Sequence, residues 1–202
     1  MLRREVAASA TRGPMSTRTA SLSAAIAPPP CRGRLLAPRY WPTWAGLGVL
    51  RAFSSLPYRL QLAAGAAIGA LLRRLPVRFV RIARRNIELC RPELDGAARL
   101  RLLDRHFRSL GIALLEIAMA WWWSSEQLAA ISSVEGMENV RAALARGRGV
   151  ILLTAHFTPL EIGGRIVAAA TPFNIVYRPT KNRALAHVLG RCRSRNGGHA
   201  IP

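Results

Sequence analysis

The spacing of apolar residues divides the chain into a helical first part and a second part in which strands and helices alternate. From residue 40 to residue 123, apolar residues form continuous runs or recur every three to four residues, which is the period of an α-helix with one buried face. This spacing predicts helices over residues 40–57, 60–75, 77–89 and 97–123. The first part of the chain is therefore expected to be all helical.

Beyond residue 123, short β-rich apolar runs alternate with helical patterns. The predicted strands cover residues 131–136, 150–155 and 173–179, and residues 197–202 begin another. The predicted helices cover residues 137–149, a segment that starts at Pro159, and residues 182–195. This alternation indicates the α/β class with a parallel sheet component. Since three strands alone would leave exposed edges, we expect the domain to be incomplete at its C-terminal end.

Residues 1–37 have no usable periodicity. They are rich in Ala, Ser, Pro and Arg and contain the stretch APPPCRGR. This composition predicts a disordered extension, and a misassigned start upstream of Met15 explains it equally well. Its arginines and serines also imitate a transit peptide, which we consider the weaker interpretation.

Residues 38–76 carry the membrane signals. Aromatic residues crowd the start of the apolar run 40–57, as they do in interfacial anchors, but Arg51 interrupts the run and it is shorter than the ~20 residues that span a bilayer. The apolar helix 60–75 follows. We predict one weak transmembrane or deeply inserted helix and one helix lying in the interface. The alternative is two buried helices of a soluble core.

The chain is strongly basic, with 30 Lys and Arg residues against 10 acidic residues and a formal net charge of +20. Such a field attracts nucleic acid, anionic lipid headgroups and acidic carrier proteins alike. Arginines concentrate just after the apolar region, which places the rest of the chain in the cytoplasm by the positive-inside rule. Residues 77–89 form a basic amphipathic pattern, suited to an anionic membrane surface or to a solvated helix face. No nucleic-acid partner is expected, because aromatic residues are not interleaved with the charges.

Cysteine and histidine spacing argues against a metal centre. The three cysteines lack CxxC spacing and the four histidines are scattered singly, so we expect reduced thiols, no disulfide framework and no metal site. His106 and Glu116 fall within the helical pattern of residues 97–123 and are interpreted as structural. The tryptophans that end this helix, residues 121–123, are expected to form an apolar wall or an interfacial anchor.

The stretch LTAHFTPLEIGG, residues 153–164, holds the candidate chemistry. Thr158 to Glu161 match a capping box with proline at the first helical position, which would explain Glu161 without any catalytic role. His156 follows a predicted strand, at the edge where α/β sheets place ligands. From the turn before a helix its imidazole could meet Glu161, whose carboxylate would orient it for general base catalysis. The residues alone leave both interpretations open.

From Pro38 to Pro202 the chain resembles the bacterial lipid A biosynthesis lauroyl acyltransferases of the lysophospholipid acyltransferase superfamily. The stretches that carry the resemblance are PRYWPTWAGLGVL, RRNIELCRPEL, LLEIAMAWWW, EGMENVRAALARGRGVILLTAHFTPLEIGGR and VYRPTKN. The defining motif of the superfamily is a histidine separated from an acid by four residues, which His156 and Glu161 match.

The resemblance implies transfer of an acyl chain, lauroyl in the named branch, from acyl carrier protein to a hydroxyl of a Kdo-bearing lipid A precursor. His156 would be the general base, Glu161 its orienting partner, and Arg178 would hold a phosphate or the donor. Residues 77–202 would be the N-terminal part of a lysophospholipid-acyltransferase-like α/β domain, with membrane-associated helices before it. The enzyme would lie at the bacterial inner membrane, facing the cytoplasm, with no metal or cofactor.

Two departures from the family pattern accompany the resemblance. Asn182 is followed by Arg183 and Ala186 where members commonly place proline and aspartate. Members also continue for roughly another hundred residues, a length comparable to much of a domain. The alternatives are therefore an acyltransferase of the same superfamily acting on another membrane lipid, and a truncated, inactive basic protein that binds membranes.

Overall fold

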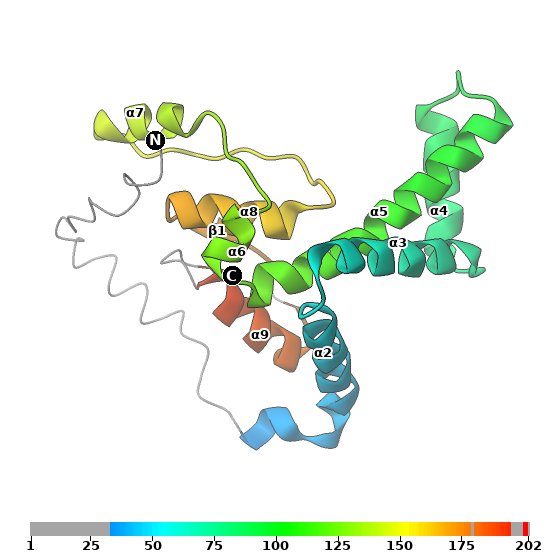
Figure 1. Ribbon diagram of the computed structural model, residues 1–202, viewed down its shortest axis with the longest axis horizontal. Coiled ribbons are helices and arrows are strands. Elements are labelled where there is room, and N and C mark those ends of the chain that lie inside the picture. The colour runs from blue at the N-terminus through cyan, green and yellow to red at the C-terminus, as the bar shows by residue number, and fades with distance from the viewer. Residues whose placement is uncertain (1–32, 179, 195–199, 202) are drawn as a thin grey trace.

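The computed structural model describes residues 33–178, 180–194 and 200–201, and it is mostly helical (Figure 1). The elements in chain order are η1 (Gly33–Leu36), η2 (Pro38–Tyr40), α2 (Trp41–Phe53), α3 (Tyr58–Arg74), α4 (Arg78–Cys90), α5 (Gly96–Trp122), α6 (Ser125–Ala129), α7 (Met137–Ala145), α8 (Leu160–Ala170), β1 (Ile175–Val176), α9 (Arg183–Arg193) and β2 (Ala200–Ile201). Each helix predicted from the sequence is present. The predicted extension, residues 1–37, lies outside the described residues except for its last five.

The sheet is smaller than the sequence predicts. β1 pairs with β2 in parallel, with Ile175 opposite Ala200 and Val176 opposite Ile201, so a parallel component exists. The predicted strands over residues 131–136 and 150–155 are wrong, because both segments are irregular. A strand forms only where its backbone groups pair with a neighbour, and the described part of the chain offers these two segments none.

Residues 150–157 are instead exposed on the surface. Ile151 is 93% exposed and Leu153 is 96% exposed, although both belong to the most apolar run of the second half. Burial of this run was expected from the α/β alternation. The α/β class is therefore present in this structure only as one small parallel pair among helices.

α3 and α5 lie side by side at very short range (Figure 1). The crossing is made by glycines: Gly65 and Gly69, one turn apart on α3, face Gly111 on α5. A Cβ at Gly65 would come within 2.7 Å of the Cα of Ile112, and a Cβ at Gly69 would overlap the carbonyl oxygen of Phe107. Only residues without a side chain allow the two backbones to approach this closely.

The main core lies where α2, α6, α8 and α9 gather around the C-terminal end of α5 (Figure 1). The predicted apolar wall is buried here, since Trp121 is 6% exposed and Trp123 is 8% exposed. Trp123 donates its indole Nε1–H to the carbonyl oxygen of Ser54 at 2.8 Å, which fixes the end of α5 against the turn after α2. The buried members of the main core are Leu47, Met119, Ala120, Trp121, Trp123, Leu128 and Ile162.

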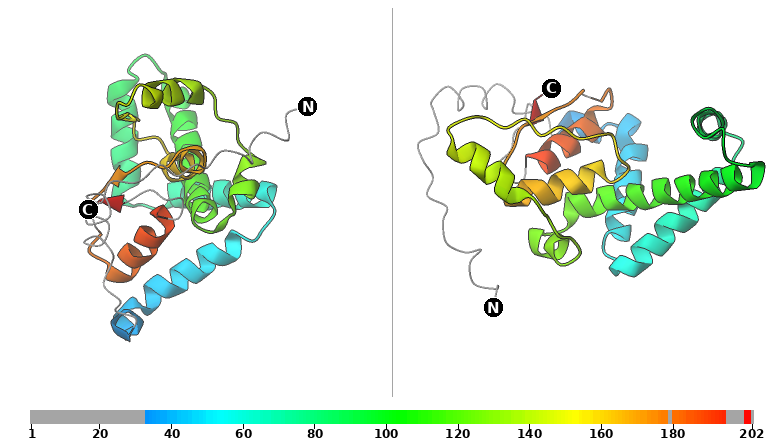
Figure 2. Two further views of the ribbon diagram at one scale, coloured as in Figure 1. Left: turned by 90° about the vertical axis from the view of Figure 1, so that its left-hand side faces the viewer. Right: turned by 90° about the horizontal axis from the view of Figure 1, so that it is seen from above.

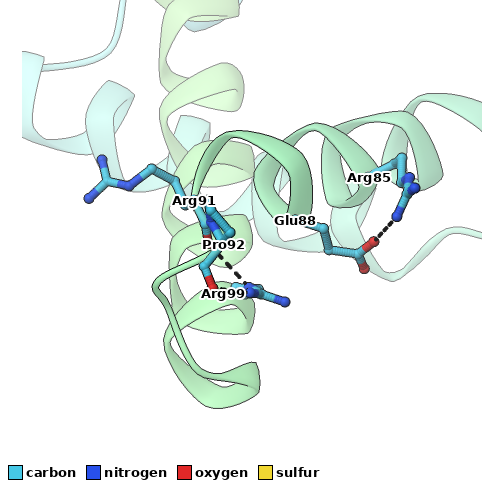
Figure 3. Close-up of polar contacts among 5 residues, drawn as sticks. All are labelled: Arg85, Glu88, Arg91, Pro92 and Arg99. Atoms are coloured by element: carbon cyan, nitrogen blue, oxygen red, sulfur yellow. Dashed lines mark hydrogen bonds and ion pairs between the residues drawn. The ribbon is translucent and has the colours of Figure 1, made fainter.

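A second, smaller core lies at the other end of α5, where α4 packs across the helix pair and forms an arm that extends from the body (Figures 1 and 2). Val80, Leu103 and Phe107 are its buried members. The turn between α4 and α5 is held by Arg99, which donates to the carbonyl oxygens of Arg91 and Pro92 (Figure 3). The arm is thus stabilised by its own small core and by the hydrogen bonds of Arg99.

Asn182 forms a polar link between α9 and α2. Asn182 caps α9 by accepting from the backbone N–H groups of Ala184 and Leu185, each at 3.1 Å. Its amide also donates to the hydroxyl of Thr43 on α2 at 2.8 Å. Asn182, which directly precedes the positions where the chain departs from the family pattern, therefore has a defined structural role.

The structure contains no single helix, within the residues it describes, that is both long enough and apolar enough to cross a membrane. α3 and α4 together reach the length and apolar composition of a span, but the pair is bent by 91°.

Candidate active site

The segment that carries the candidate chemistry leads into α8. The backbone of Pro159 occupies the N-cap position of α8, and no side chain caps this helix. The predicted capping box from Thr158 to Glu161 is therefore wrong. The physical reason is that the carboxylate of Glu161 accepts hydrogen bonds from charged and indole donors on other helices, which are stronger than a bond to a neutral backbone N–H.

Glu161 is held by donors from two other helices. Arg193, in the last turn of α9, donates from Nη2 to Oε2 at 2.8 Å and from Nε to Oε1 at 3.1 Å. Trp121, at the end of α5, donates from Nε1 to Oε1 at 3.3 Å. The side chains of Glu161 and Arg193 are each only 22% exposed, so the ion pair is largely shielded from water. We refer to Glu161, Arg193 and Trp121 as the carboxylate cluster.

Arg193 is itself braced on its other side. Its guanidinium carbon lies 5.3 Å from the centroid of the Tyr177 ring, in the range of a cation–π contact. The hydrogen bond to Glu161 raises the pKa of Arg193, while burial acts in the opposite direction. The chain segment around β1 therefore contributes to the cluster as well as α5, α8 and α9.

His156 and Arg178 stand apart from the carboxylate cluster. His156 is exposed, in the irregular segment between α7 and α8, and no hydrogen bond or ion pair joins it to Glu161 in the described structure. Arg178 is exposed directly after Tyr177. The structure thus brings Glu161 to a packed cluster but leaves His156 and Arg178 at the surface, and the pairing of His156 with Glu161 stays a prediction.

Comparison with known sequences shows to which protein family the chain belongs. The profile described as "Bacterial lipid A biosynthesis acyltransferase" matches residues 29–202. The chain belongs to this family. It is 41% identical over 161 residues to a lipid A biosynthesis palmitoleoyltransferase of Escherichia coli K12, an alignment that covers 80% of this chain and 53% of the relative.

Two further relatives give the same picture. The chain is 40% identical to a lipid A biosynthesis lauroyltransferase of Escherichia coli K12, over 79% of this chain and 53% of the relative. It is 37% identical to a lipid A biosynthesis acyltransferase of Haemophilus influenzae, over 82% of this chain and 54% of the relative. The chain therefore spans about half the length of these relatives. No solved structure matches it.

For this family member, sequence reasoning found Glu161 but missed its partners. Arg193 lies 32 positions from Glu161 and Trp121 lies 40 positions away, so no local pattern links them. One signal was available: Arg193 directly follows Cys192, on the apolar face by which α9 packs against the main core. An arginine placed next to a buried face is stabilised by an acidic partner, and Glu161 is the only acidic residue in the sequence after Glu138.

The described residues include no group of three histidine, cysteine or acidic side chains close enough to hold a metal ion. Cys90 is an exposed free thiol, the Sγ of Cys192 contacts the backbone carbonyl oxygen of Trp121, and Cys31 lies outside the described residues. The site residues predicted from the sequence thus offer the exposed imidazole of His156, the carboxylate of Glu161 and the exposed guanidinium of Arg178.

Proposed function

We propose that this chain is the N-terminal part of an acyltransferase that moves a fatty acyl chain, lauroyl, from acyl carrier protein to a hydroxyl of a Kdo-bearing lipid A precursor. The observation that carries this proposal is the family match over residues 29–202, which includes the histidine and glutamate at the family's spacing.

In the proposed reaction, His156 removes the proton from the acceptor hydroxyl. The hydroxyl oxygen attacks the thioester carbonyl of the donor at the same time. A carbon–oxygen bond forms, the carbon–sulfur bond breaks, and the imidazolium returns the proton to the leaving thiolate. Glu161 orients the imidazole and stabilises its charged form. The exposed position of His156 agrees with this role, because both substrates must reach it.

Arg178 is proposed to bind a phosphate of the lipid acceptor or of the carrier's prosthetic group. A planar guanidinium presents two N–H donors in the geometry of two phosphate oxygens. The exposure of Arg178 and its position directly after Tyr177 support this role, since the side chain is free to reach a ligand next to the carboxylate cluster.

The acyl chain and the carrier are part of the proposal. Named relatives of nearly equal identity act with palmitoleoyl and with lauroyl chains, so the preference must be measured. A competition assay with equal amounts of lauroyl, myristoyl and palmitoleoyl carrier protein would measure it. Dominant incorporation of lauroyl supports the proposal; dominant incorporation of a longer chain corrects the donor while leaving the reaction class intact.

The reaction itself is tested by acyl transfer from lauroyl carrier protein to the purified Kdo-bearing precursor, using the full-length protein. His156→Ala is expected to lower kcat about 1,000-fold, because general base catalysis contributes roughly 10²–10⁴-fold. His106→Ala, on the exposed surface of α5, is the matched control and should keep wild-type activity. Wild-type activity in His156→Ala would refute the role of His156, and transfer to another purified lipid instead would favour a different acceptor.

We also propose that the protein acts at the cytoplasmic face of the inner membrane and that α4 contacts anionic headgroups there. Phe79 is 46% exposed and Ile82 is 47% exposed, and both line a shallow apolar groove between α4 and α5. The exposed arginines of α4 border these apolar side chains: they are Arg78, Arg81, Arg84 and Arg85. A helix with apolar and cationic residues side by side is suited to the lipid–water interface.

Vesicle flotation tests the membrane proposal. Each arginine near an anionic surface contributes about 1 kcal/mol, so Arg81→Gln with Arg84→Gln should weaken binding to vesicles containing phosphatidylglycerol about 30-fold at low salt. Arg141→Gln with Arg146→Gln, at exposed positions in and just after α7, is the matched control. Equal binding of both double variants would contradict the assignment of α4 as the contact surface.

A further inference from the structure

The carboxylate of Glu161 is fixed in direction as well as in charge. Arg193 makes two roughly parallel N–H···O bonds, one to each oxygen, and such a fork defines the plane of the carboxylate. The indole of Trp121 adds a third bond, to Oε1. A surface glutamate would rotate freely about its last torsion, whereas this one has a single orientation set by two helices other than its own.

The side chain of Arg193 is held in place by contacts that do not involve Glu161. The guanidinium of Arg193 lies against the ring of Tyr177, on the chain segment that forms β1, and its neighbour Cys192 packs with the main core. Arg193 is therefore supported by α9 and by the segment after β1 independently of α8. A preorganised arginine loses little side-chain freedom when it pairs, so the guanidinium of Arg193 holds the carboxylate of Glu161 in one orientation.

The cluster leaves part of the carboxylate unused. A carboxylate offers about four acceptor positions, and the three donors occupy two on Oε1 and one on Oε2. Oε2 therefore keeps one lone pair. Glu161 stands in the first turn of α8, on the side of the chain from which His156 enters, and only four residues separate the two.

We propose that Arg193 is the positioning residue of the active site: it holds Glu161 so that the remaining lone pair of Oε2 is directed to the imidazole of His156. This inference rests on the proposed function. Arg193 touches neither substrate nor reacting atoms in this scheme. It acts through Glu161, and Trp121 limits the rotation of the same carboxylate from the opposite helix.

The decisive experiment is chemical rescue in the full-length protein. Arg193→Ala should lower kcat about 100-fold with KM for both substrates little changed, because a reacting pair displaced by about 1 Å loses roughly that factor. Tens of millimolar guanidinium chloride should then restore at least about a tenth of the lost rate by refilling the space between Glu161 and Tyr177. Potassium chloride at the same ionic strength should restore none of it.

Controls separate positioning from folding. Arg183→Ala, an exposed arginine in the first turn of the same helix, should match wild type in kcat. If Arg193→Ala fails to fold, Arg193→Lys keeps the charge and the stem but loses the fork, and it should still show a kcat reduced about tenfold or more. Guanidinium should not rescue Arg193→Ala when it is combined with Glu161→Gln, since no carboxylate remains to be oriented.

Each outcome decides the matter. Loss with rescue by guanidinium alone supports the positioning role. Wild-type kcat in Arg193→Ala, or a loss that guanidinium does not relieve in a folded protein, refutes the role of Arg193 and leaves the proposed function standing. A wild-type protein that transfers acyl groups to no lipid refutes the proposed function first, and the two failures are therefore distinguishable.

Discussion

Glu116 lies in the middle of α5, half-buried between apolar positions of the same helix. Removal of a carboxylate from water disfavours its charged form, so burial raises the pKa of Glu116. The folded protein therefore holds this proton more tightly than the unfolded chain does. A residue interpreted from the sequence as a polar inclusion thus has a measurable effect on stability.

The sign of that effect follows from linkage. As the pH rises from the ordinary carboxylate pKa to the raised one, the unfolded chain releases its proton first, so the free energy of unfolding falls across this window and then levels off. Glu116→Gln cannot ionise and should be the more stable protein at neutral pH, with the difference vanishing below about pH 4. Urea unfolding followed by circular dichroism at a series of pH values would measure it.

Glu138→Gln provides the comparison, since Glu138 is exposed on α7. The free energy of unfolding of Glu138→Gln should vary with pH as that of the wild type does, between the ordinary carboxylate pKa and the raised one. A profile of Glu116→Gln that runs parallel to the wild type would contradict the buried carboxyl as the cause.

Glu161 shows what could and could not be predicted at a single residue. Its position in the first turn of a helix and its spacing from His156 are local properties, and both were available in the sequence. Its partners were not, because Trp121 and Arg193 approach it only after α5, α8 and α9 have packed. The capping box failed for the same reason: local pairing competes with long-range partners, and here the ion pair is the stronger interaction.

The crossing of α3 and α5 depends on three glycines, so its stability can be tested with single methyl groups. At Gly69 an added Cβ would overlap the backbone of Phe107, which a rigid helix cannot move aside. Gly69→Ala should therefore lower the free energy of unfolding by about 3 kcal/mol. Thermal or urea unfolding would detect this loss readily.

Gly46→Ala is the matched control, because a Cβ at Gly46 on α2 meets nothing within 4 Å. Alanine is the better helix former by about 0.5–1 kcal/mol, so this variant should be slightly more stable than wild type. Opposite signs for the same chemical change would demonstrate that contact, not helix propensity, governs Gly69. Equal effects would contradict the close crossing.

Asn182 permits a similar separation of local and long-range contributions. Asn182→Ala removes the cap of α9 and the bond to Thr43, and it should cost about 1–2 kcal/mol of stability. Asn182→Ser keeps a capping oxygen but cannot reach Thr43 in the same way, so it should recover most of the loss. If both variants were equally unstable in urea, the bond to α2 rather than the cap would be the larger contribution.

Helices were more predictable from this sequence than strands, of which two of four predicted segments contain an observed strand, and the difference is physical. A helix satisfies its own backbone hydrogen bonds, so the spacing of apolar residues within 77–89 or 97–123 is sufficient to place it. A strand depends on a neighbour that the pattern does not contain. Residues 173–179 found such a neighbour over two positions, whereas residues 131–136 and 150–155 did not.

Across the whole molecule, apolar side chains are distributed unevenly between two cores and an open segment. Leu153 is 96% exposed, whereas Phe107 is 1% exposed in the core of the arm. In the 202-residue chain, Leu153→Ser should change the free energy of unfolding by less than about 0.5 kcal/mol, because no packing is lost. Phe107→Ala should cost about 3–5 kcal/mol.

The same unfolding experiment checks both variants. A large loss for Leu153→Ser would mean that residues 150–157 are packed in solution, contrary to the structure. In that event the strand predicted over residues 150–155 would regain support, since its burial was the basis of that prediction.

α5 spans 27 residues, about 40 Å at 1.5 Å per residue, and it is a member of both cores. Leu103 and Phe107 face one core from its first half, and Trp121 faces Glu161 from its end. The number of residues between Phe107 and Trp121 therefore fixes the direction in which Trp121 points relative to the arm. One alanine inserted at Leu114 would turn Trp121 about 100° away from Glu161, whereas seven inserted residues would return it to within about 20° of its original direction.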